Sequence, residues 1–166
     1  MKLFKLTNSQ KGQSLIEAMV ALGAAVLVVS AITIAVVSAL NNVQYAKNQN
    51  LATQYAQQGL ENMRQTGLSN WALLSSYSSG RYCLDQSKTV LSAINPATNS
   101  CGQNMGSFSR EIDLEQGSLS NCNGNISVNV IVAWGDGKCT TSGNPLCHTV
   151  VLNSCLSNYN NTIQAP

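Results

Sequence analysis

The sequence predicts an α+β protein in which one long N-terminal helix packs on a small antiparallel sheet stabilised by disulfides. Three observations indicate this fold class. An apolar run without a charge extends from Ala18 to Leu40, and small and apolar residues continue beyond it at helical spacing. Short runs that alternate apolar and polar residues then follow between turn residues. All six cysteines lie in this later part of the chain.

Residues 13–40 are predicted to form a helix that is apolar enough to lie in a membrane. The charge-free run exceeds the ~20 residues that a helix needs to cross a bilayer. Three lysines precede it, no basic residue follows it until Lys47, and basic residues stay on the cytoplasmic side of a membrane. We therefore expect a single-pass protein of the cytoplasmic membrane whose C-terminal part is exported.

The most specific motif is the sequence Lys-Gly-Gln-Ser-Leu-Ile-Glu at residues 11–17, directly before the apolar run. It resembles the N-terminus of type IV pilins and of the pseudopilins of type II secretion. The resemblance implies a leader, residues 1–12, that a prepilin peptidase removes by cleavage between Gly12 and Gln13, followed by N-methylation of Gln13. It also implies that Glu17 docks each subunit into a helical filament, a pilus or pseudopilus at the cell surface.

The same resemblance implies a set of partners. They are the prepilin peptidase, other pilin or pseudopilin subunits, an assembly platform in the inner membrane, and membrane lipid before assembly. Major pilins usually have phenylalanine where this chain has Gln13, and many have a proline in the middle of the apolar helix, whereas the first proline here is Pro96. These two differences favour a minor pilin or minor pseudopilin.

Glu17 also has a physical argument of its own. A carboxylate in low-dielectric surroundings needs a cationic partner or must take up a proton, and no lysine or arginine lies between Lys11 and Lys47. The nearest candidate cation is the α-amino group that cleavage creates at Gln13. Because a filament aligns one helix against the next, the amino group of a neighbouring subunit is the favoured partner.

Two other kinds of N-terminal segment share some of these features. A secretory signal peptide has an apolar core of about 7–15 residues and a small-residue cleavage site, whereas this run is longer and has an acid at its start. A plain signal anchor would leave Gly12 and Glu17 without a role. The alternative function is a membrane-anchored extracellular binding or adhesin module that does not polymerise.

Residues 41–66 are predicted to continue the helix as an amphipathic half that packs on the head. The run 51–64 also resembles the corresponding helix of minor pilins and pseudopilins, and Glu61 and Arg64 in it are spaced to form an ion pair on the helix surface. The segment contains no proline, and its small or apolar residues form one helical stripe: Ala52, Ala56, Gly59 and Met63.

Residues 67–166 are predicted to form a β-rich globular head. Serine, asparagine and glycine become frequent from Thr66-Gly67 onward, and short β-type runs stand between turn clusters. Apolar residues alternate with smaller or polar ones from Ile126 to Trp134, which predicts that one face of the sheet packs on the amphipathic helix. The strand candidates are Arg81–Leu84, Ser107–Leu114, Ile126–Trp134 and His148–Cys155.

An even number of cysteines in an exported segment indicates disulfides in an oxidising compartment. We pair Cys139 with Cys147 because they flank an insertion in the connection between the last two strands, where a hairpin brings its arms together. Six cysteines permit many pairings, and spacing does not decide among them. The assignments adopted for the other four are Cys83 with Cys101 and Cys122 with Cys155.

Charge and residue types exclude several function classes. Without the leader, six basic residues stand against seven acidic ones, so we expect no nucleic-acid partner. His148 is the only histidine, no cysteine pair has C-x-x-C spacing, and no catalytic triad or cofactor fingerprint is present. We therefore expect a structural protein without enzyme activity, cofactor or metal.

Overall fold

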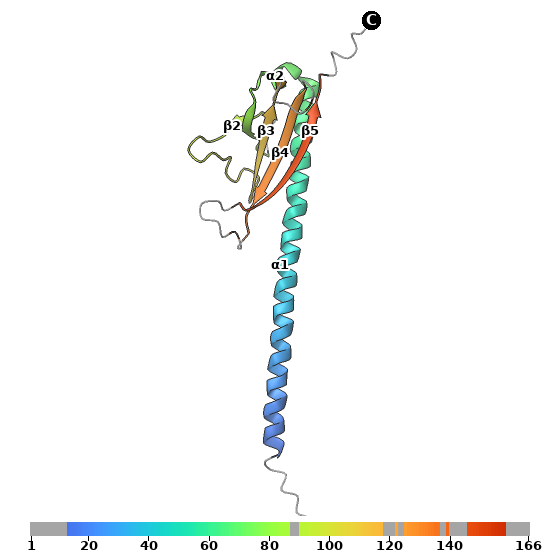
Figure 1. Cartoon of the computed structure of the whole chain (residues 1–166), viewed down its shortest axis with the longest axis vertical. Helices are drawn as coiled ribbons and strands as arrows, with labels where there is room; N and C mark the ends of the chain where they lie inside the picture. The colour runs from blue at the N-terminus through green and yellow to red at the C-terminus, as the bar shows by residue number, and fades with distance from the viewer. Residues whose placement is uncertain are drawn as a thin grey trace, which may run out of the picture. The chain divides into compact units, whose positions relative to one another are not determined.

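The computed structural model describes residues 13–86, 90–117, 122, 125–136, 139 and 146–158. In this part of the chain, one long helix, one short helix and a five-stranded antiparallel sheet are formed (Figure 1). The chain divides into two compact units, one that ends at Gln44 and one that begins at Tyr45. The predicted fold class, a pilin-like α+β arrangement of a long helix on an antiparallel sheet with disulfides, is confirmed.

Helix α1 extends from Gln13 to Ser69 and has 57 residues. No proline interrupts it, so each interior N–H can donate to the carbonyl four residues earlier. The predicted helix ends at residue 66, but α1 continues through Gly67. A Cβ at Gly67 would lie 3.2 Å from Leu74 Cδ2, so this glycine lets Leu74 pack closely against α1 and does not end the helix.

A second helix that sequence analysis did not predict follows directly. Helix α2 runs from Trp71 to Ser76, and Asn70 is its N-cap residue. The Asn70 Oδ1 atom accepts a hydrogen bond from the Leu73 backbone N–H at 2.9 Å. This bond satisfies one of the free donors at the start of the helix, so the cap at Asn70 separates the two helices.

The described residues of the head contain five strands in the spatial order β2-β1-β3-β4-β5, all antiparallel to their neighbours. All four predicted strands are present, with ends shifted by one residue at most. The two-residue strand β2 was not predicted. The strands are β1 (Gly80–Cys83), β2 (Ser92–Ala93), β3 (Phe108–Glu115), β4 (Ile126–Trp134) and β5 (His148–Leu156).

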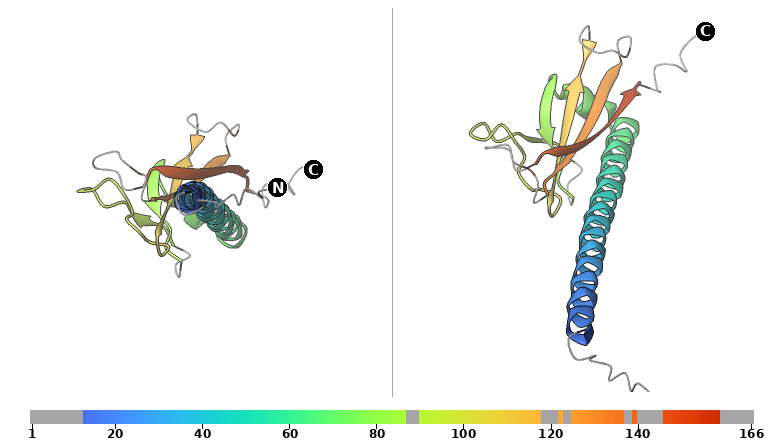
Figure 2. Two further views of the ribbon diagram at one scale, coloured as in Figure 1. Left: turned by 90° about the horizontal axis from the view of Figure 1, so that it is seen from below. Right: turned by 60° about the horizontal axis from the view of Figure 1, so that its bottom comes forward.

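The hydrophobic core lies between the sheet and the part of α1 that belongs to the head, which covers one face of the sheet (Figure 2). The predicted helical stripe is buried there, with Ala52 and Ala56 fully inaccessible and Met63 nearly so. The alternation predicted for β4 is confirmed, because every second residue from Ile126 to Trp134 is buried against the helix. The apolar residues at every second position of β4 and the small or apolar residues at helical spacing in α1 therefore form one core.

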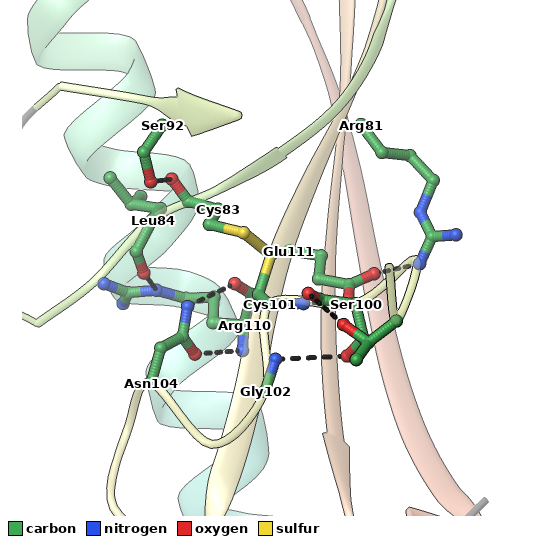
Figure 3. Close-up of a disulfide and its surroundings, with 11 residues drawn as sticks. Arg81, Cys83, Leu84, Ser92, Ser100, Cys101, Gly102, Asn104, Arg110 and Glu111 are labelled. Carbon is green, nitrogen blue, oxygen red and sulfur yellow. Dashed lines mark hydrogen bonds and ion pairs between the residues drawn. A yellow bond between two sulfur atoms is a disulfide. The ribbon is translucent and has the colours of Figure 1, made fainter. Parts of the chain in front are cut away.

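A buried arginine joins three segments of the chain that meet at this core. The Arg110 side chain on β3 has no exposed surface, and its Nε donates to the Leu84 carbonyl oxygen at 3.0 Å (Figure 3). On the helix, Nη1 donates to the Tyr55 carbonyl at 3.1 Å and to Gln58 Oε1 at 3.2 Å. Nη2 donates to the Asp85 carbonyl at 3.1 Å. These bonds tie α1 to the segment after β1 and to β3.

The charge of Arg110 is tolerated because these oxygen atoms surround it. Burial lowers the pKa of Arg110 from its usual value, and the charge of Asp85 opposes that shift. The backbone is also fixed, since Asn104 Nδ2 donates to the Arg110 carbonyl at 2.9 Å and the Arg110 N–H donates to Asn104 Oδ1 at 2.7 Å (Figure 3). A buried guanidinium with several acceptors in place is consistent with a stable core.

Gly59 leaves the space that Arg110 needs. A Cβ on Gly59 would lie 3.0 Å from Val130 Cγ1 and 3.2 Å from Arg110 Cδ. The glycine in the helical stripe therefore permits close contact between α1 and the sheet, at the expense of the helix propensity that alanine would give.

Replacing Arg110 with methionine should destabilise the head strongly. Arg110→Met keeps much of the volume but leaves the buried carbonyl oxygens of Leu84 and Tyr55 without this donor, which should lower the free energy of unfolding by about 2–4 kcal/mol. Urea unfolding of the full chain in detergent, followed by tryptophan fluorescence, measures this because both tryptophans lie in the head.

The matched control is Arg64→Met, which makes the same replacement at an exposed arginine of α1. Its unfolding midpoint should match the wild type, since exposed ion pairs contribute little. An Arg110→Met protein with the wild-type midpoint would contradict the assigned role of Arg110.

Candidate functional site

The first part of α1 presents apolar side chains that nothing in its own unit covers. All described side chains from Leu15 to Leu40 are exposed, with Leu27 at 73% and Val36 at 50% of their full surface. By length and composition this helix could cross a membrane. Contiguous apolar surface of this extent marks a site that lipid or protein occupies.

Two of the three hydroxyl groups between Ala18 and Leu40 form hydrogen bonds inside the helix. Ser30 Oγ donates to the Val26 carbonyl at 2.7 Å, and Thr33 Oγ1 donates to the Val29 carbonyl at 2.8 Å. Side chains that bond to the backbone four residues earlier need no water or partner group. These two polar residues are therefore compatible with lipid or with apolar helix packing.

Glu17 is the ionisable residue of this segment. It lies in the second turn of α1, on the exposed surface, and α1 begins at Gln13. No lysine or arginine of the helix is close in sequence, because the next basic residue is Lys47. The leader and Gly12 lie outside the described residues, so cleavage at Gly12 and methylation of Gln13 remain predictions, as does the assembly role of Glu17.

All six cysteines of the head form disulfides in the structure. The pairs are the same three that the sequence analysis adopted: Cys83–Cys101, Cys122–Cys155 and Cys139–Cys147. The first bridge closes the segment after β1, the second joins the residues before β4 to β5, and the third closes the β4–β5 connection. Such bridges stabilise a small head mainly by restricting its unfolded state.

The Cys83–Cys101 bridge holds a polar contact over β3 (Figure 3). Glu111 is nearly buried, although it lies on the sheet face opposite α1, and its carboxylate forms an ion pair with Arg81. Its Oε1 also accepts a hydrogen bond from the Cys101 backbone N–H at 3.2 Å. The segment around Cys101 thereby covers this part of the outer face.

His148 is paired with Asp136 at the end of the β4–β5 hairpin. His148 Nε2 lies 3.0 Å from Asp136 Oδ2, and the register places His148 directly opposite Trp134. The His148 ring contacts Trp134 and Tyr45, with centroid separations of 5.3 and 5.1 Å. His148 is the first residue of β5, where the predicted strand also begins.

The end of this hairpin also holds a cluster of potential metal ligands that sequence analysis missed. Ligand atoms of Asp136, Cys139, Cys147 and His148 all lie within 4.8 Å of one another. The absence of C-x-x-C spacing argued against a metal site. This criterion considers only residues that are close along the chain, so it overlooks residues that strand pairing brings together. The signal was the predicted hairpin, since pairing of β4 with β5 brings Asp136 beside His148.

Glu61 and Arg64 form the predicted pair on the exposed side of α1. Arg64 Nε and Nη2 each donate to a Glu61 carboxylate oxygen at 2.7 Å, and Gln65 Nε2 donates to the same carboxylate at 3.1 Å. The hydrogen bond from Arg64, followed by that from Gln65, lowers the pKa of Glu61 to about 2. The same contact raises the pKa of Arg64.

The fold and its surface define a class of protein: a disulfide-bonded α+β head on a long helix whose N-terminal part has an exposed apolar surface. Comparison with known proteins adds no relative, because no family model, no curated protein and no solved structure matches the chain.

Replacing Arg64 with glutamine should return the pKa of Glu61 from about 2 toward its ordinary value of 4.5. The reason is the loss of the two charge-assisted bonds. Because the folded-state pKa is lowered, the small stability that this exposed pair contributes is present above the ordinary pKa and is lost as the pH falls toward 2. Carboxylate NMR titration measures the pKa, and an unchanged value in Arg64→Gln would contradict the assignment.

Proposed function

We propose that the protein is a structural subunit, a minor pilin or minor pseudopilin, of a type IV pilus or related filament. In this proposal a prepilin peptidase cleaves the chain between Gly12 and Gln13. The subunit is stored in the cytoplasmic membrane and is then incorporated into the filament through the N-terminal part of α1. The disulfide-bonded head is displayed outside the membrane.

The observation that carries the proposal is the exposed apolar surface of α1 with Glu17 at its start. Lipid covers such a surface in the membrane, and equivalent helices of neighbouring subunits can cover it in a filament. A plain membrane anchor has the same need for lipid but has no use for an acid near its start. Glu17 therefore favours a helix that leaves lipid for a protein environment.

The role proposed for Glu17 is to set the register between neighbouring helices. Removing the leader would place a free α-amino group at Gln13, one helical turn before Glu17. A carboxylate and an amino group of adjacent subunits neutralise each other in the apolar filament core, whereas either one alone is costly there. The pair would thus select one alignment of the helices.

The disulfides and the charges before the apolar run support the proposed topology. Lysines in the leader keep it on the cytoplasmic side, and disulfides form outside the reducing cytoplasm. Ser30 and Thr33 bond within α1, whereas Glu17 is the charged group of the segment and needs a partner in apolar surroundings.

Replacing Glu17 with alanine should leave membrane insertion intact but reduce incorporation into filaments by ~10-fold or more, because an amino group left unpaired in the filament core costs several kcal/mol. The measurement is the ratio of this subunit in sheared filaments to that in membranes, by quantitative immunoblot of its own cells.

The matched control is Ser30→Ala, which removes a polar group from the same apolar segment whose bond is already internal. It should assemble as the wild type does. Normal incorporation of Glu17→Ala would contradict the docking role. Absence of the wild-type protein from every filament fraction would instead favour a membrane-anchored binding or adhesin module.

A further inference from the structure

The hairpin end of the head carries four side chains of the kinds that bind zinc. Asp136 follows β4 by two residues, His148 is the first residue of β5, and Cys139 and Cys147 lie in the connection between them. Their oxygen, nitrogen and sulfur ligand atoms lie within 4.8 Å of one another. Two cysteines, a histidine and an aspartate form a complete donor set for tetrahedral Zn²⁺.

We propose that the reduced form of this hairpin binds one Zn²⁺ through Asp136, Cys139, Cys147 and His148. In the disulfide form the two sulfurs are bonded to each other, so only the carboxylate and the imidazole remain as donors. A dithiol reductant transfers two electrons and two protons to the disulfide and becomes a disulfide itself. Zn²⁺ then replaces the two thiol protons, which are released to solvent.

His148 is already held in place by β5 and by packed rings, and Asp136 lies beside it. The ring of His148 lies against Trp134 and Tyr45, and its Nε2 faces Asp136 Oδ2 at 3.0 Å. Zn²⁺ would enter between these two atoms and bind both. Support of the ring by packed neighbours fixes its orientation, as outer contacts do in metal sites.

The sulfur ligands need only a local adjustment. With Zn–S bonds of ~2.3 Å and Zn–N or Zn–O bonds of ~2.0–2.1 Å, tetrahedral ligand atoms lie roughly 3.3–3.8 Å apart. The present separations, up to 4.8 Å, must close by about an ångström, while the two sulfurs move apart from bonding distance. The Asp136 backbone N–H already donates to Cys139 Sγ at 3.3 Å, a contact that favours a thiolate.

This disulfide is also the one that solvent reaches most easily. Neither of its cysteines is buried, because Cys147 is exposed and Cys139 is partly exposed. Each of the other bridges has one buried member, Cys83 or Cys122, at 7% exposure, although Cys155, the partner of Cys122, is exposed. A mild reductant should therefore open Cys139–Cys147 first, and leave the bridges that hold the sheet intact. The inference is independent of the proposed filament function, because it concerns only the hairpin of the head.

The test uses the full chain in detergent, treated without oxygen with a limiting amount of a phosphine reductant. Alkylation and peptide mass mapping identify the opened disulfide. Co²⁺ is then added as a spectroscopic substitute for Zn²⁺. The expected result is one Co²⁺ per chain with tetrahedral visible bands and a thiolate-to-metal charge-transfer band, both removed by Zn²⁺. The untreated disulfide form should show no charge-transfer band.

Matched variants locate the site. Cys139→Ser with Cys147→Ser should abolish the charge-transfer band, whereas Cys83→Ser with Cys101→Ser removes the same number of thiols and should retain it. His148→Gln should weaken Zn²⁺ binding by more than the ~10–100-fold that loss of an outer contact causes. Far-UV circular dichroism verifies that each variant is folded.

Three results would overturn the inference. They are reduction of another bridge before Cys139–Cys147, no metal binding by the reduced wild type, and equal metal binding by the variant that lacks Cys139 and Cys147.

Discussion

The apolar surface of the N-terminal part of α1 has to be covered. The proposed storage in the membrane and the later incorporation into a filament both follow from this requirement. Side chains such as Leu27 and Val36 keep at least half of their surface exposed within their unit, which water does not solvate favourably. Lipid satisfies this requirement without selecting any register. Neighbouring helices satisfy it as well, and an acid such as Glu17 then distinguishes one alignment from another.

The second part of α1 has a different role, because the small head packs on it. Small residues at Ala52, Ala56 and Gly59 let the sheet approach closely, and Arg110 uses that proximity to bond to the helix backbone at Tyr55. A charged group at the centre of the packing also makes it specific, because only one placement of α1 on β3 supplies its acceptors. One continuous helix thus combines an apolar half with a half that is fixed to the head.

The long helix and the four main strands could be predicted because their apolar periodicity extends over many residues. The strand β2 and the helix α2 are too short to show a period, and Gly67 has the appearance of a helix end although α1 continues through it. An arginine in a strand is expected to face water, but Arg110 is in phase with Phe108 and Ile112, which was the signal that it faces the core. The group at Asp136 and His148 depends on strand register, which spacing along the chain does not provide.

The N-terminus of the mature protein tests the central claim most directly. Intact mass combined with N-terminal sequencing, on protein purified from its own cells, determines where the chain begins and how many disulfides it holds. A filament subunit processed by a prepilin peptidase begins at Gln13, with or without a methyl group, and carries three disulfides. A chain that begins at Met1 would contradict processing and would leave an anchored, exported domain.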